Sequence, residues 1–263
     1  TSKQTTKNTT LAICTTQALK DITHPILNTQ QDNHTIPHKT LSLWHTNINS
    51  IYRKYNTLTT HIKLFTPNTP DILTITDNRI TDPSDQTIYP IDTYQQRHAV
   101  DVSVYTKVNM HITFIDDIHT TGAATIILQI HKNKHKNNPT HTIINIYRRP
   151  PPDPNFPNNL QNTINEIHKR YPKTHITIQG DLNINLLKLK TPFYHTLIEN
   201  NLHTTITTPT RYDTQHKTHS LIDPTLTTLT HIPVPTTAGT VSPPISDHPT
   251  TAGTVSPPNH SRH

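Results

Sequence analysis

The segment ITIQGDLN at residues 176–183 joins a short β-type run to a carboxylate and an amide. Its three leading residues are β-branched and predict a buried strand. Gly180 is one of two glycines outside a terminal repeat, so its place directly before Asp181 is informative. Alternation along an extended backbone puts Asp181 and Asn183 on one face, where they can hold a water and a phosphate oxygen. Taken alone, the segment is equally consistent with a polar turn.

Short runs rich in Ile, Val, Leu and Thr lie on the N-terminal side of this segment and predict further strands. They cover residues 41–48, 72–75, 100–105, 111–115, 124–130 and 142–147. Apolar residues at helical spacing occur in residues 51–65, 156–171 and 193–198. Because the helices fall between strands, the pattern predicts an α/β sandwich whose strands are covered by outer helices.

Polar side chains stand at the ends of several segments, where strand packing does not require them. They are Asn47 and Asn49, Asp77, Tyr147 and Arg148, Ser220 and Asp223, and Ser246, Asp247 and His248. Carboxylates, an Asp/Asn pair and an Asp-His pair at such ends suit metal-assisted phosphodiester hydrolysis.

Composition narrows the function classes. The 23 Lys and Arg against 17 Asp and Glu give a net charge of +6, which suits a polyanionic partner such as nucleic acid. A single cysteine, Cys14, cannot form an internal disulfide and favours a reducing compartment. No stretch reaches the roughly 20 apolar residues of a membrane span, and no secretory signal is recognisable. We therefore expect a soluble, intracellular protein.

The two ends of the chain differ from the middle. Residues 1–40 are polar and are interpreted as a leader or linker. Ten residues, PTTAGTVSPP, occur at 235–244 and again at 249–258. We interpret the repeat as a low-complexity segment, with a tail at 249–263 outside a domain at 41–248. Neither the leader nor the tail is expected to hold stable structure.

The order of these motifs resembles the superfamily of metal-dependent endonucleases, exonucleases and phosphatases. It is most similar to the apurinic-endonuclease-like nicking domain of non-LTR retrotransposons of the LINE and jockey types. The matching segments are residues 47–49, 76–77, 147–151, 180–183, 209–211, 220–223 and 246–248. The resemblance covers about residues 41–248.

The resemblance implies a four-layered sandwich of two mixed β-sheets flanked by helices, with the site at one edge of the sheets. It implies Mg²⁺, with Mn²⁺ as a second choice, held by Asp77 and Asp247. The implied catalytic residues are Asn47, Tyr147, Asp181, Asn183, Asp223 and His248. The residues expected to contact nucleic acid are Arg148, Arg211 and Ser220.

The implied roles are specific. Asp181 would orient or deprotonate the attacking water, and Asn47 and Asn183 would hold the phosphate and its surroundings. Tyr147 would hydrogen-bond the phosphate. His248 would contact the scissile phosphate, with Asp223 fixing its ring.

Departures from the family pattern keep more than one function open. Asp77 is one methylene shorter than the family's glutamate, a difference of about 1.5 Å in reach. Residues 98–101 lack the family's glycines, and the repeat stands where a final strand is expected. The alternatives are an Mg²⁺-dependent endonuclease that nicks target DNA and a decayed remnant that at most binds nucleic acid. A phosphatase of the same superfamily is a third, less favoured choice.

The expected partner is DNA, and the expected compartment is the nucleus. Reverse transcriptase motifs do not occur in the sequence, so such a region would belong to a longer polyprotein. No membrane partner is expected, and the oligomeric state is left open.

Overall fold

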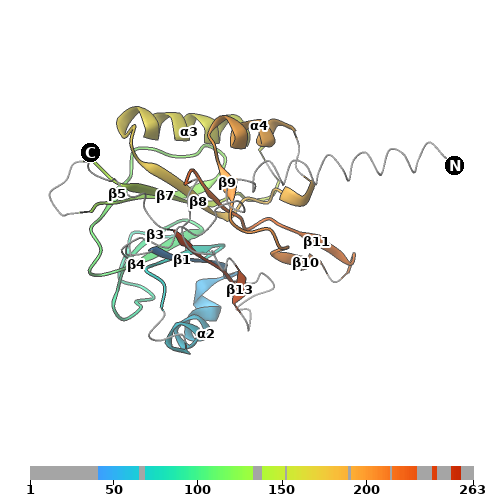
Figure 1. Ribbon diagram of the computed structural model, residues 1–263. Coiled ribbons are helices and arrows are strands. Elements are labelled where there is room, and N and C mark those ends of the chain that lie inside the picture. Colours follow the sequence, from blue (N-terminus) through green and yellow to red (C-terminus); the bar gives the residue numbers. More distant parts are fainter. Residues whose placement is uncertain are drawn as a thin grey trace, which may run out of the picture.

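The computed structural model describes residues 41–64, 69–132, 138–151, 153–188, 191–213 and 215–229, together with the backbone of strands 239–241 and 250–255. Two six-stranded sheets face each other, and helices cover their outer faces, so the chain forms four layers (Figure 1). The α/β sandwich expected from the sequence is therefore confirmed. None of the described helices combines the length and apolar character that a membrane crossing needs.

Sheet A has the strand order β13-β14-β1-β2-β4-β3. Its strands are β1 (Leu41–Asn47), β2 (Ile72–Thr76), β3 (Tyr94–Ala99), β4 (Val102–Lys107), β13 (Gly239–Val241) and β14 (Thr250–Val255). Strands β1 and β2 are parallel, and helix α2 (Ile51–Leu64) connects them. The buried face of α2 packs Ile51, Leu58 and Ile62 against the outer face of this sheet.

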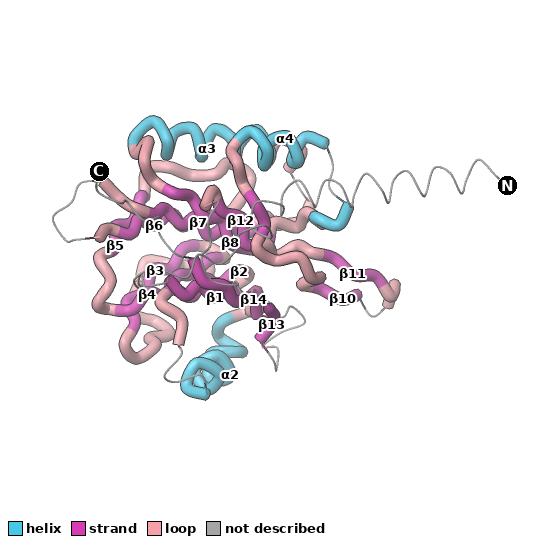
Figure 2. Tube along the Cα trace, viewed as in Figure 1, coloured by secondary structure: helices cyan, strands magenta, loops and turns pink. Residues whose placement is uncertain are grey.

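Sheet B has the order β5-β6-β7-β8-β12-β9. Its strands are β5 (Ile112–Ile115), β6 (Ala124–Ile130), β7 (His141–Tyr147), β8 (His175–Asp181), β9 (His203–Thr204) and β12 (Thr225–Thr227). Strands β7 and β8 are parallel and are connected by α3 (Phe156–Arg170). A 3-10 turn (Leu186–Lys188) and α4 (Thr191–Glu199) follow, and the hairpin β10 (Arg211–Asp213) and β11 (Thr218–Ser220) extends away from the sandwich (Figure 2).

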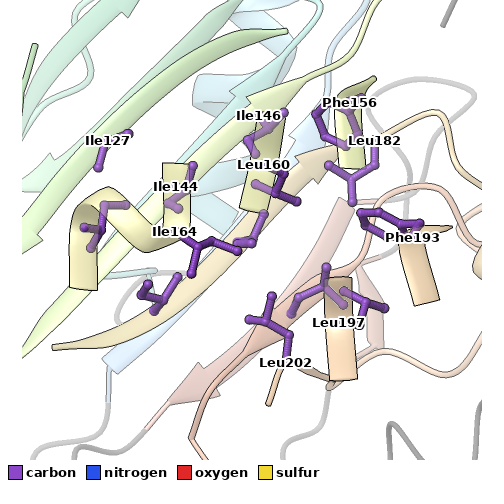
Figure 3. Close-up of a cluster of buried hydrophobic side chains, with 14 of the residues drawn as sticks. Ile127, Ile144, Ile146, Phe156, Leu160, Ile164, Leu182, Phe193, Leu197 and Leu202 are labelled. Atoms are coloured by element: carbon purple, nitrogen blue, oxygen red, sulfur yellow. The ribbon is translucent and has the colours of Figure 1, made fainter. Parts of the chain in front are cut away.

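The largest core lies between sheet B and its helices. Phe156, Leu160 and Ile164 of α3 and Phe193 and Leu197 of α4 project onto the sheet (Figure 3). There they contact a sheet face of fully buried side chains that includes Ile144, Ile146 and Ile178. Burying such side chains stabilises the fold by about 1.5–3 kcal/mol each. The spacing of these residues explains why the segment at 156–171 forms a helix.

The interface between the two sheets is partly polar. Leu43 and Ile72 of sheet A and Leu128 and Ile143 of sheet B belong to one buried apolar cluster. Beside it, Thr74 Oγ1 donates to Gln179 Oε1 at 3.3 Å, and Asn145 Nδ2 donates to the Ile75 carbonyl oxygen at 3.1 Å. These hydrogen bonds cross from one sheet to the other, so they constrain how the sheets align.

Two sequence-based predictions need correction. The strand expected at 100–105 begins at Val102, and β3 (YQQRHA) was missed because it is too polar to show a strand pattern. The repeat was expected to lie outside the sheets and to replace a final strand. Instead, its second copy contributes β14, which pairs antiparallel with β1, and its first copy contributes β13. Backbone hydrogen bonding explains why the repeat forms strands, because a Thr-rich segment can become a strand wherever the edge of another strand is available.

Candidate active site

The two parallel strand pairs bring their carboxyl ends to one edge of the sandwich. In sheet A, Asn47 ends β1 beside Thr76 of β2, and Asp77 follows directly. In sheet B, Tyr147 ends β7 beside Asp181 of β8. Connections through helices return each chain in the same direction, so both strand ends of a pair share an edge. Asn47 Nδ2 donates to Asp181 Oδ2 at 2.8 Å, which shows that the two edges meet.

Both oxygens of the Asp181 carboxylate have a fixed donor. Asn47 donates to Oδ2, and the backbone N–H of Asn183 donates to Oδ1 at 2.9 Å. The residue is 3% exposed. A buried carboxylate needs such donors, because an unpaired buried charge is costly. The carboxylate is therefore held in one orientation.

Gly180 explains the close approach of β7 and β8 at this point. Its φ is +144°, and a Cβ atom there would collide with the backbone of Ile146. Any side chain would force the two strands apart. The glycine therefore permits Asp181 and Tyr147 to lie side by side, which gives a physical reason for the Gly-Asp order seen in the sequence.

Asn183 links the loop after β8 to the loop after β7. Its Nδ2 donates to the Arg148 carbonyl oxygen at 2.7 Å, and the Arg148 N–H donates to the Asp181 carbonyl oxygen at 3.0 Å. The φ of Asn183 is +47°, a conformation that asparagine tolerates better than most residues. Asn183 therefore fixes the loop as well as donating to Asp181.

Arg148 was expected to contact nucleic acid, but the structure places its side chain inside the protein. The residue is 7% exposed. Its guanidinium donates to the Asp153 carbonyl oxygen at 3.0 Å and lies 5.1 Å from the ring centroid of Phe156. These contacts tie the loop after β7 to the start of α3, so a structural role accounts for Arg148.

Tyr147 lies among several charges. Its pKa is raised to about 12, first by burial and then by the negative charges of Asp77, Asp181 and Asp101. Arg149 acts in the opposite direction. The phenol is therefore protonated at neutral pH and can donate a hydrogen bond to a phosphate oxygen.

Asp77 occupies the loop between β2 and the segment that follows it. Its φ is +51°, and its carbonyl oxygen accepts from the Ser50 N–H at 2.8 Å. The carboxylate is 18% exposed and lies 3.4 Å from Arg79 Nε. Asp77 is therefore more exposed to solvent than Asp101 and Asp181, the other acidic residues near Tyr147.

The donor chemistry of this edge is of the kind that binds a divalent cation. Among the described residues, no group of three or more His, Cys, Asp or Glu side chains is placed to hold a metal ion. Mg²⁺ does not require such a group, because it commonly uses one or two carboxylates and retains waters. Asp77 can supply such a carboxylate. The second predicted ligand, Asp247, and the predicted catalytic residue His248 lie outside the described residues.

Asp223 lies on the other side of β8, two residues before Thr225, which pairs with Gln179. It is 1% exposed, and its Oδ1 is 3.7 Å from Nε2 of His45, a fully buried residue of β1. Sequence reasoning overlooked His45. The available signal was a single imidazole next to Trp44 within β1, LSLWHTN.

Arg211 and Ser220 are direct partners on the β10–β11 hairpin. Arg211 is exposed and Ser220 half-buried. The neighbouring pair, Tyr212 and His219, brings its ring centroids within 4.7 Å. The hairpin thus presents a cation and two rings in tilted contact to solvent, and Asp223 follows three residues after its end.

The four-layered sandwich is a DNase I-like fold, which it shares with solved AP endonucleases and a retrotransposon endonuclease domain. An AP endonuclease from Leishmania major superposes with a TM-score of 0.60 at 10% identity, over 93% of this chain and 98% of that chain. The endonuclease domain of TRAS1, a telomere-specific non-LTR retrotransposon, gives 0.55 at 16% identity, over 83% of this chain and 99% of that chain.

A third solved structure with this fold is a 3′ phosphatase from Neisseria bound to a product DNA hairpin. It gives a TM-score of 0.55 at 14% identity, over 81% of this chain and 98% of that chain. No protein-family model matches the sequence, and no curated protein sequence matches it. At these identities the likeness establishes the fold.

Proposed function

We propose that this chain is an Mg²⁺-dependent endonuclease domain that nicks DNA, of the kind carried by non-LTR retrotransposons. The observation that carries the proposal is the meeting of Asn47 and Asp181 beside Tyr147 and Asp77, from two different sheets. Hydrophobic packing does not require such a group, because each buried polar side chain adds a desolvation cost. The two carboxylates, the amide and the phenol of this group suit phosphodiester hydrolysis.

Each described residue has a defined task in the proposed reaction. Asp181 orients the attacking water and accepts its proton, and Asn47 keeps the carboxylate in position. The Tyr147 phenol donates a hydrogen bond to a non-bridging phosphate oxygen. Asp77 would hold the metal ion, which would supply positive charge to stabilise the charge that develops on the phosphate. Asp247 and His248 are proposed to complete the site, with Asp223 orienting His248.

DNA as the substrate is supported by charge and by the exposed hairpin. The chain carries a net charge of +6, and the exposed Arg211 lies opposite the half-buried Ser220 on the hairpin. Arginine and serine are common donors to phosphate oxygens. We further propose that the domain works in the nucleus as part of a longer polyprotein with a reverse transcriptase region.

The deciding experiment is nicking of supercoiled plasmid by the parent protein, Asp181→Ala and Asp77→Glu, each with Mg²⁺, with Mn²⁺ and with a chelator. Asp181→Ala should abolish nicking, because it removes the group that activates the water. Asp77→Glu should raise nicking by roughly 10- to 100-fold, the scale of changes in a metal's ligand shell. The chelator should stop all activity.

Equal background cleavage by all three proteins would reject the endonuclease and leave the nucleic-acid-binding remnant as the function. The ion pair of Arg79 with Asp77 is the observation that favours this second candidate, because the guanidinium offers the carboxylate a cation other than a metal. Release of phosphate from a 3′-phosphorylated oligonucleotide without plasmid nicking would instead identify a phosphatase.

A further inference from the structure

Arg149 forms an asymmetric ion pair at the edge of the candidate site. Its Nε and Nη2 both contact Oδ2 of Asp101, which lies in the tight turn between β3 and β4. The Asp101 side chain is 8% exposed, whereas that of Arg149 is 59% exposed. The carboxylate therefore anchors one edge of the guanidinium from inside, while the rest of the group faces solvent.

The position of this pair is set by both sheets. Arg149 follows β7 of sheet B, and Asp101 belongs to sheet A with a φ of +63°. The Asp101 carbonyl oxygen accepts from the Asn78 N–H at 3.2 Å, which ties the turn to the loop that carries Asp77. Arg149 therefore belongs to the same edge as the catalytic candidates.

The charges at this edge give Arg149 a function beyond its ion pair. The carboxylates of Asp77, Asp101 and Asp181 all act on Tyr147, and together they would repel a phosphate. Arg149 is the cation that acts on the same phenol. A planar guanidinium can bind a carboxylate along one edge and a phosphate along another.

We propose that Arg149 binds a DNA backbone phosphate next to the one that Tyr147 contacts, and that Asp101 is a positioning residue that aims the guanidinium. The inference rests on the proposed function, because both phosphates belong to the same DNA strand. Anchoring by Asp101 lowers the conformational entropy that a long side chain loses on binding. Because the guanidinium is mostly exposed, the ion pair contributes little to stability, and the free edge of Arg149 is available to a ligand.

The test is the salt dependence of DNA binding, measured by fluorescence anisotropy of a labelled duplex in the presence of a chelator. Each phosphate that a cation neutralises contributes about 0.9 to the slope of log affinity against log salt. Arg149→Ala and Arg149→Gln should each make this slope shallower by about 0.9, whereas Arg149→Lys should keep it. The matched control is Arg170→Ala, at the far end of α3, where the guanidinium pairs with Asp117 and Glu166.

A positioning role for Asp101 must be tested by a measurement that a purely structural role would not change. Asp101→Glu keeps the negative charge but moves the carboxylate by one methylene, so it should weaken DNA binding several-fold at low salt while its salt slope stays near that of the parent. If the parent nicks DNA, Arg149→Gln should raise KM more than it lowers kcat, since a neighbouring phosphate is bound equally in the ground and transition states. Melting temperatures close to that of the parent would show that the variants fold.

The outcomes separate this inference from the proposed function. A shallower slope for Arg149→Gln in a protein that nicks no plasmid supports the phosphate site and rejects the nuclease. Equal slopes for the parent, Arg149→Gln and Arg170→Ala overturn the phosphate site even if nicking occurs. Failure of the parent to bind the duplex at about 50 mM salt also overturns it, because nonspecific phosphate binding is strongest at low salt.

Discussion

The side chain of Asn47 donates a hydrogen bond to the carboxylate of Asp181 over 2.8 Å, although 134 residues separate them. Asn47 ends β1 in sheet A, and Asp181 ends β8 in sheet B. This hydrogen bond can form only when the two sheets are aligned as they are here. It also fixes the group that is proposed to activate water.

Asn47→Ala should lower nicking by roughly 10- to 100-fold, the usual cost of losing a partner that orients a site residue. Asn47→Asp should lower it further, because two carboxylates at hydrogen-bond distance cannot both ionise. Plasmid nicking measures both effects. Asn162→Ala, on the exposed face of α3, is the control. Nicking by Asn47→Ala at the parent's rate would show that Asp181 needs no support from sheet A.

Tyr147 should stay protonated in alkaline solution. Its folded pKa of about 12 lies above the ordinary value, so the stability linked to it is present below about pH 10 and is lost as the pH rises through 12. The difference in ultraviolet absorbance between the parent and Tyr147→Phe, followed against pH, isolates this phenol. Ionisation of Tyr147 near pH 10 would contradict the surrounding negative charge. Tyr147→Phe should also reduce nicking at every pH tested.

Gly180→Ala should destabilise the protein, because the added methyl group collides with the backbone of Ile146. Overpacking of this kind costs about 1–3 kcal/mol. Urea denaturation measures the loss. The control is Gly122→Ala, whose Cβ would meet the side chain of Asp153, which can move more easily than a strand. An equal loss for the two variants would argue against a special role for the approach of β7 to β8.

His141 should make the fold sensitive to mild acid. Burial, and then the nearby positive charge of His175, lower its pKa to about 3. The folded pKa lies below the unfolded value, so the stability linked to His141 is complete above about pH 6.5 and falls with pH toward 3. The free energy of unfolding should fall by about 2 kcal/mol between pH 7 and pH 5 from this residue.

Urea denaturation at the two pH values tests this directly. His141→Gln keeps a side chain that can hydrogen-bond to the Thr177 hydroxyl, which lies 2.7 Å from His141 Nε2, and removes the titrating ring. Its stability should change less with pH than that of the parent. His216→Gln, at an exposed position of the hairpin, should behave like the parent. If the free energy of unfolding changed equally with pH in the parent and in His141→Gln, His141 would not be the source of the acid sensitivity.

Sequence pattern was sufficient for the elements with strong local signals. The run at 124–130 forms β6 with the same bounds, and the helical spacing at 156–171 forms α3. Side-chain alternation and helical periodicity act over a few residues, so they can be read without the fold. The same approach missed β3, whose polar residues carry no such pattern, and it assigned the repeat containing β14 to a tail.

The sequence alone also determined which residue types stand at the strand ends, including Asp181 with its preceding glycine. Only the tertiary structure decided which of them meet: Asn47 contacts Asp181, Asp223 lies near His45, and Arg148 turns inward. The reason is physical. The identity of a strand end is local, but its neighbours depend on parallel pairing within each sheet and on hydrogen bonds that align one sheet with the other.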